Sequence, residues 1–273
     1  MESFEHLHVT TEHQGHLVRL CFEHGKANEM GRAHVAELAR LVDALENSDA
    51  RAMISHSQRI TRSGTLVFSA GADVHERRDW DEGSVLLHVR GQRRTLQRLA
   101  LAPLFHVCVV DGLALGWGTE FCLTADYIIA SPKARFGLPE TGLGIVPGAG
   151  GTAQLASRVG LGHALRMGMT GELIDAEEAL RVGLVHELCD SADDAMERAQ
   201  ALAQRCMSRS PTAVAAYKDA VRAGVGLSDD ERESQESRAY EHCVTCGEAA
   251  RGRQAFEALK SGELLDWGPR RGR

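Results

Sequence analysis

Two glutamates stand in glycine-rich stretches that could position acid–base chemistry. Glu120 ends the run Gly-Leu-Ala-Leu-Gly-Trp-Gly-Thr-Glu at residues 112–120, and Glu140 follows Pro139 shortly before a second run at 143–152. Glycines in such runs let the backbone pass close to whatever a site holds. Two carboxylates brought together raise the pKa of at least one of them, because like charges resist joint ionisation. One can then act as a general base and the other as a general acid.

The same stretches offer backbone amides for a developing oxyanion. An apolar run at 105–110 leads through the glycine turn into a helix, whose first N–H groups lack helical partners and lie at the positive end of the helix dipole. If residues 116–118 open this helix, the N–H of Trp117 is a free donor, and Ala72 in the turn at 69–73 supplies a second. Two such donors suit a thioester enolate, and removing one typically costs about 2.7–4 kcal/mol of transition-state stabilisation.

Structural alternatives apply to each of these features. A glutamate in the first turn of a helix is commonly only a partner of the dipole, and a glutamate after proline is commonly an exposed turn residue. The run at 148–153 matches a dinucleotide fingerprint, but Pro147 precedes it and no acidic residue follows about 20 positions on. Cys243 and Cys246 lack a second cluster of ligands, so no metal site is predicted.

The elements that must hold these residues follow a strand-then-helix rhythm. Alternating residues predict a strand over 16–22 with a hairpin partner at 6–10, and apolar residues at helical spacing predict a helix over 32–47. Further strand-like runs lie at 65–68, 105–110 and 127–130. This order favours a parallel sheet with crossover helices, an α/β fold. Beyond residue 191 the pattern is helical almost throughout.

Composition excludes several classes of protein. The chain has 273 residues, 43% of them hydrophobic, and a net charge of −7, which gives no general attraction for nucleic acid. The N-terminus lacks a signal pattern, and no window approaches 18 uninterrupted apolar residues, so no membrane association is expected. Seven cysteines scattered through apolar runs fit reduced, buried thiols. We therefore expect a soluble, cytoplasmic protein.

Several segments resemble the enoyl-CoA hydratase/isomerase family, also called the crotonase superfamily. The resemblance rests on Phe-Ser-Ala-Gly-Ala-Asp at 68–73, on 112–120 with Ala125 and Asp126, on Phe-Gly-Leu-Pro-Glu at 136–140 and on Pro-Gly-Ala-Gly-Gly-Thr at 147–152. Residues 170–172, 176–185 and 255–256 are similar to later family segments, so the likeness runs in order over nearly the whole chain.

The resemblance implies a fold and an assembly. The expected fold is a crotonase-like spiral of ββα turns over residues 1–190, which carries the active site. A helical C-terminal region over 191–273 would serve packing and oligomerisation, with a trimer or a dimer of trimers as the expected homo-oligomer.

The resemblance also implies residue roles. The N–H groups of Ala72 and Trp117 would hold the thioester oxygen, and Glu120 and Glu140 would activate and deliver water, with the N–H of Gly148 helping to hold that water. The stretch at 70–75 would line the path of adenine and pantetheine, and its residues include Ala70, Asp73, Val74 and His75.

Two positions depart from the family pattern. Trp117 stands where the family usually has glycine; its side chain points either into the acyl pocket, which it would reshape, or into the core, where it would only pack. His75 stands where many relatives have lysine. The weaker charge would either soften the grip on the CoA phosphates or suit a carrier-protein thioester.

These observations predict an enoyl-CoA hydratase or dehydratase, a carbon–oxygen lyase. Its partner would be an acyl-CoA thioester, or an acyl-carrier thioester, and it would need no cofactor beyond the coenzyme A of the substrate. An isomerase, thioester hydrolase, decarboxylase or C–C lyase would keep the oxyanion donors and change the chemistry. A non-catalytic acyl-thioester binder is the alternative from another class.

Overall fold

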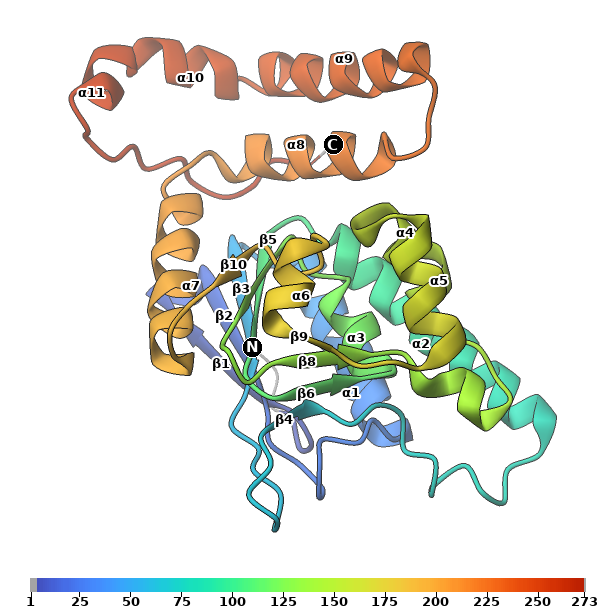
Figure 1. The fold of residues 1–273 in the computed structure, drawn as a ribbon. Helices are drawn as coiled ribbons and strands as arrows, with labels where there is room; N and C mark the ends of the chain where they lie inside the picture. The colour runs from blue at the N-terminus through green and yellow to red at the C-terminus, as the bar shows by residue number, and fades with distance from the viewer. Residues whose placement is uncertain (1–3, 273) are drawn as a thin grey trace.

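The chain forms two sheets, and from β3 to β8 successive strands belong to one sheet and the other in turn (Figure 1). The computed structural model describes residues 4–272. A six-stranded sheet has the order β1-β2-β3-β5-β7-β10, and a four-stranded sheet has the order β4-β6-β8-β9. Their bounds are β1 (His8–Glu12), β2 (Leu17–Phe22), β3 (Ala52–Ser57), β4 (Val67–Ser69), β5 (Phe105–Val110), β6 (Leu113–Leu115), β7 (Tyr127–Ala130), β8 (Arg135–Gly137), β9 (Ile174–Asp175) and β10 (Glu187–Leu188).

Each turn of the spiral gives one strand to each sheet and then a helix. β3 and β4 precede α2 (Glu82–Leu101), β5 and β6 precede α3 (Trp117–Cys122), and β7 and β8 precede α4 (Gly151–Val159). The strands within each sheet pair in parallel, apart from β1 with β2 and β8 with β9, which are antiparallel. The predicted α/β spiral of ββα turns is therefore confirmed.

Other predicted elements shift by a few residues. The hairpin partner expected at 6–10 is β1 at His8–Glu12, and the helix expected at 32–47 is α1 (Arg32–Glu46). The remaining helices are η1 (His13–Gly15), η2 (Pro139–Leu143), α5 (Leu161–Thr170), α6 (Ala176–Arg181), α7 (Ala192–Met207), α8 (Pro211–Ala223), α9 (Asp229–Thr245), α10 (Glu248–Gln254) and α11 (Phe256–Lys260).

The six-stranded sheet buries both of its faces, because successive side chains of a strand point to opposite sides. One face, with Leu20 and Met53, joins α1, α2 and α3 in the main core. The other face, with Leu17 and Ile54, packs against the alanines of α7 at positions 195, 199 and 203. α7 is therefore fixed to the sheet, whereas Figure 1 shows α8 and α9 as a hairpin beyond it.

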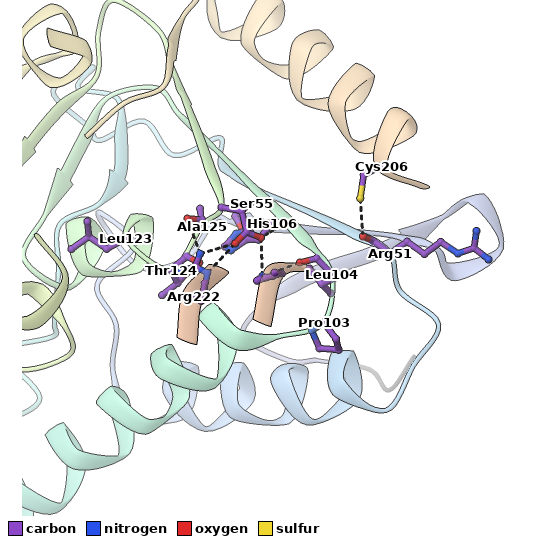
Figure 2. A network of polar contacts seen from close by, with 12 residues as sticks. Arg51, Ser55, Pro103, Leu104, His106, Leu123, Thr124, Ala125, Cys206 and Arg222 are labelled. Atoms are coloured by element: carbon purple, nitrogen blue, oxygen red, sulfur yellow. Dashed lines mark hydrogen bonds and ion pairs between the residues drawn. The ribbon is translucent and has the colours of Figure 1, made fainter. Parts of the chain in front are cut away.

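A buried ionic network attaches α8 to the core. Asp126 accepts from Lys218 Nζ at 2.7 Å and from Arg222 Nη2 at 2.6 Å. Arg222 also donates to the carbonyls of Thr124 and Ala125, and both contacts can be followed in Figure 2. The backbone N–H of His106 completes the shell of Asp126 at 2.8 Å.

None of the helices in the described chain is both long and apolar enough to cross a membrane.

Candidate active site

Helix α3 carries Trp117 and Glu120, and hydrogen bonds to the four-stranded sheet fix its first turn. Gly116, at φ +50°, precedes the helix and donates its N–H to Gly137 O of β8 at 2.9 Å. Thr119 Oγ1 donates to Ala114 O at 2.6 Å, which ties the helix to β6. A Cβ on Gly118 would lie 2.6 Å from Ser69 O, so only glycine allows α3 to approach the end of β4 so closely.

Two turns bring the candidate amide donors together. Gly71 has φ +104°, and a Cβ built on it would lie 3.6 Å from the Trp117 nitrogen and 2.9 Å from Leu115 O. Trp117 is the first residue of α3, where an N–H has no helical partner. Across residues 4–272, neither the N–H of Ala72 nor that of Trp117 has a protein acceptor. Two unshared donors therefore lie in adjacent turns.

The Trp117 indole lies in the core. It is 2% exposed and packs against Phe22, edge-on at 6.3 Å between centroids, and against Phe121 at 5.4 Å. The sequence left open whether this side chain points into the acyl pocket or into the core, and the structure places it in the core. The side chain therefore contributes packing, while the backbone N–H of Trp117 remains available.

Glu120 is buried and is held by the loop before α4. Its Oε1 accepts from the N–H of Ala149 at 2.7 Å and from the N–H of Gly151 at 2.8 Å, while Oε2 makes no protein hydrogen bond in the described chain. Burial raises the pKa of Glu120, against the opposing effect of these amides. One oxygen is thus fixed and the other is left for a ligand.

Glu140 lies over the start of the same helix and is half-buried, whereas Glu120 is fully buried. A Cβ on Gly116 would lie 2.9 Å from Glu140 Oε1, and Glu140 Oε2 is buried without a partner among residues 4–272. Burial raises the pKa of Glu140 to about 7, and the charge of Glu120 adds to this shift. A carboxyl group with this pKa carries a transferable proton near neutrality.

The other predicted site residues, in the 70–75 stretch and at Gly148, differ in their contacts and exposure. Ala70 and Asp73 join the turn to the segment before α1, through Ala70 N–H to Ala27 O at 2.9 Å and Asp73 N–H to Met30 O at 3.2 Å. Val74 and His75 are exposed beside it. Gly148 accepts from Arg93 Nε at 2.7 Å through its carbonyl.

Sequence reasoning missed the residues that hold Glu120. Ala149 and Gly151 lie in the recognised Pro-Gly-Ala-Gly-Gly-Thr run, so the glycine pattern marked the loop without showing which amides turn inward. Arg93 on α2 acts on Glu120 through its charge, and no motif indicated it. Within residues 4–272, no cluster of three or more histidine, cysteine, aspartate or glutamate side chains is arranged to hold a metal ion.

The fold and these two glycine turns define a ββα spiral protein with two unshared backbone amides and two carboxyl groups around the start of α3. The family model described as enoyl-CoA hydratase/isomerase matches residues 14–262. A relative named short-chain-enoyl-CoA hydratase, from Clostridium acetobutylicum, is 32% identical over 91% of this chain and 94% of its own. The Escherichia coli relative named 2,3-dehydroadipyl-CoA hydratase is 38% identical over 68% of this chain and 71% of its own.

Comparison with solved structures points to the same family as these relatives do. The crystal structure of an enoyl-CoA hydratase from Bacillus anthracis superposes with a TM-score of 0.86 at 30% identity, covering 96% of this chain and 99% of that one. The chain therefore belongs to the enoyl-CoA hydratase/isomerase family. The resemblance seen in the sequence is confirmed, and so is the prediction of an enzyme of the hydratase class, a carbon–oxygen lyase.

Proposed function

We propose that this chain adds water reversibly across the α,β double bond of an enoyl-CoA thioester, with Ala72 and Trp117 as oxyanion donors. In this proposal their N–H groups bind the thioester oxygen and stabilise the enolate that forms when water attacks. Support comes from the adjacency of the two turns and from the absence of a protein acceptor for either N–H across residues 4–272. Each such donor typically supplies about 2.7–4 kcal/mol.

The two glutamates divide the proton transfers. The water oxygen bonds to the β-carbon while ionised Glu120 takes a proton from that water. Protonated Glu140 gives its proton to the α-carbon, the enolate electrons form the new C–H bond, and the thioester carbonyl is restored. The proposal also assigns the N–H of Gly148 to the water and the 70–75 stretch to coenzyme A. All groups used belong to the chain or to the substrate, so the proposal includes no further cofactor.

The observation that carries this proposal is the unequal setting of the two carboxyl groups. Glu120 has two backbone donors on one oxygen, whereas Glu140 has a buried oxygen with no donor in the described chain. Paired carboxyl groups in unlike environments are how proteins separate an acid from a base.

Single substitutions test the two roles. We expect Glu120→Gln and Glu140→Gln each to lower turnover of crotonyl-CoA by about 10²- to 10⁴-fold, the usual contribution of positioned proton transfer. Hydration is followed as loss of the conjugated thioester absorbance, with the added water confirmed by product mass. Glu177→Gln is the matched control, because Glu177 is an exposed glutamate in the first turn of α6. Undiminished turnover in either site variant would remove that residue from the mechanism.

Two further parts of the proposal concern assembly and location. We propose a homotrimer or a pair of trimers, supported by exposed apolar side chains on α5 and on the hairpin of α8 and α9. We also propose a cytoplasmic location, supported by seven free cysteines, which fit a reducing compartment.

A further inference from the structure

Arg77 is a partly buried arginine without an ion pair in the described chain. It follows the candidate oxyanion turn by a few residues and is held by one contact, in which its Nη2 donates to Gln92 Oε1 at 3.2 Å. Its Nε is buried and has no hydrogen-bond partner among residues 4–272. A buried guanidinium normally has its donors occupied, because leaving a buried donor without a partner is destabilising.

Gln92 on α2 also has a buried donor without a hydrogen-bond partner in the described chain. Its side chain is buried, at 3% exposure, and its Nε2 has no partner within the described residues. Because Oε1 accepts from Arg77, the amide orientation is fixed by that bond and the NH₂ group is the end left over. Arg77 Nε and Gln92 Nε2 are therefore two unused donors on side chains that touch each other.

This pair lies near Glu120 and the loop that holds it. Burial lowers the pKa of Arg77, and the charges of Glu76, Asp73 and Glu120 oppose the shift, with Glu76 the largest and Glu120 the smallest of the three. Helix α2 also borders the loop that holds Glu120, since a Cβ on Gly148 would lie 2.7 Å from Val89 Cγ1. One residue beyond Gln92, Arg93 donates to Gly148 O at 2.7 Å.

We propose that Arg77 and Gln92 form an acyl-group subsite that binds a carboxylate at the far end of the substrate's acyl chain. The inference rests on the proposed hydratase function, because the oxyanion turn fixes one end of the acyl chain and Glu120 marks its β-carbon. In this proposal the two unused donors face the part of the acyl chain beyond that carbon. The substrate class is an enoyl-CoA thioester of a dicarboxylic acid.

A carboxylate matches this subsite better than a neutral group does. A planar guanidinium and an adjacent amide present two N–H donors to two oxygens, which is the arrangement that gives strong charge-assisted hydrogen bonds. The other carboxylates near Arg77 already bind backbone amides: Glu76 Oε2 accepts from Arg32 N–H at 2.8 Å, and Asp73 Oδ1 accepts from Glu76 N–H at 2.9 Å. Within residues 4–272 neither carboxylate accepts a hydrogen bond from the Arg77 guanidinium, so its buried Nε is the donor left for a ligand.

Length-matched substrates test the subsite. We expect kcat/KM for 2,3-dehydroadipyl-CoA to exceed that for trans-2-hexenoyl-CoA by at least about tenfold, because only the former offers acceptors to the paired donors. Binding of saturated adipoyl-CoA and hexanoyl-CoA, measured by calorimetry, gives a second readout that needs no turnover. Adipoyl-CoA should bind more tightly by a similar factor.

Variants separate the carboxylate contact from general damage. Arg77→Met keeps the length of the side chain and removes its charge, and Gln92→Glu places a competing carboxylate on Arg77. Each should reduce the preference for the dicarboxylic substrate by at least about tenfold. Arg90→Met on α2 is the matched control, since Arg90 is exposed, and it should leave the preference unchanged. Thermal melting of every variant reports folding.

The possible outcomes separate a failure of the carboxylate subsite from a failure of the proposed hydratase function. Hydration of hexenoyl-CoA without a preference for the dicarboxylic substrate would overturn the subsite and leave the hydratase in place. Equal losses on both substrates in Arg77→Met would also overturn it. Absence of hydration on every thioester, with Glu120 and Glu140 intact, would instead count against the proposed function.

Discussion

At the residue scale, the chemistry depends on how differently the protein surrounds two identical side chains. Glu120 is buried yet shares one oxygen with two amides, whereas Glu140 has no donor on its buried Oε2 within the described chain. Burial raises the pKa of both carboxyl groups, and that of Glu140 reaches about 7. Near pH 7 the Glu140 carboxyl group is therefore protonated in part of the population, as the proposed mechanism needs.

This state predicts a pH profile. Hydration begins with Glu140 protonated and Glu120 ionised, and the reverse reaction begins with the same single proton on the other partner. Because the hydration equilibrium does not involve free protons, kcat/KM must follow pH identically in both directions. Activity should fall as pH rises through about 7, where the pair loses its proton, and fall again in acid, where both are protonated.

The measurement is kcat/KM for crotonyl-CoA and for 3-hydroxybutyryl-CoA across this range. Glu177→Gln should keep the wild-type profile. An upper limb displaced to strongly alkaline pH, or a rate that rises through neutrality, would contradict the role assigned to Glu140.

At the element scale, short glycine turns set the geometry more than side-chain contacts do. Gly71 has φ +104°, and a Cβ at this position would lie 2.9 Å from Leu115 O, so a side chain there would strain the backbone and push the two turns apart. We expect Gly71→Ala to lower kcat on crotonyl-CoA by about 10²-fold or more, the effect of losing one oxyanion donor.

Gly64→Ala is the control for this variant. Gly64 also has a left-handed φ, +82°, but a Cβ there would meet nothing within 4 Å. Both substitutions strain the backbone, so thermal melting should fall in both while turnover falls only in Gly71→Ala. Equal turnover in the two variants would show that the Ala72 amide does not depend on this turn.

A second element, α8, is attached through a buried charge cluster. Lys218 is 9% exposed and donates to Asp126 and to Leu104 O at 2.8 Å. Burial alone would raise the pKa of Asp126, but the charges of Lys218 and Arg222 outweigh it and hold the pKa below its ordinary value. The stabilisation from Asp126 is therefore present above the ordinary aspartate pKa and is lost as pH falls through the lower, folded pKa.

Removing one member of this cluster should be costly. We expect Lys218→Met to lower the free energy of unfolding by about 3 kcal/mol, because it leaves Asp126 buried with one cation fewer. Urea unfolding monitored by circular dichroism measures this, and Lys133→Met at an exposed lysine is the control. A loss no larger than that of the control would mean that packing of α8, rather than charge, attaches it.

At the scale of the whole molecule, periodicity predicted the elements but not their side-chain neighbours. The strand and helix runs predicted a parallel α/β core, and the family segments predicted the spiral. The direction of the Trp117 indole could not be predicted, because it depends on Phe22, which lies far away in the sequence. The contact between Arg77 and Gln92 could not be predicted either, because it joins two segments and corresponds to no sequence motif.

The exposed apolar surface is also a property of the whole molecule. One patch on α5, the end of η2 and the loop before α4 comprises Leu143, Ile145, Val146, Leu161, Leu165 and Met169, and Met169 is 72% exposed. A hairpin patch comprises Tyr217, Val221, Val225, Tyr240 and Val244, beside a cavity of about 710 Å³ between α8 and α9. Exposed apolar patches of this kind commonly mark protein interfaces.

Two unlike patches on one chain favour a closed ring over a pair. A dimer related by a two-fold axis needs only one self-complementary surface, whereas contact between different surfaces on successive copies continues until the ring closes. The family resemblance implies three copies in such a ring, so we expect sedimentation to give a trimer or a pair of trimers. Met169→Glu or Tyr217→Glu should each yield smaller species, because a buried unpaired carboxylate opposes association. Ile60→Glu, at a 56% exposed position outside both patches, should leave the assembly intact. A wild-type monomer, or a ring that tolerates a charge in both patches, would mean that these surfaces serve another partner.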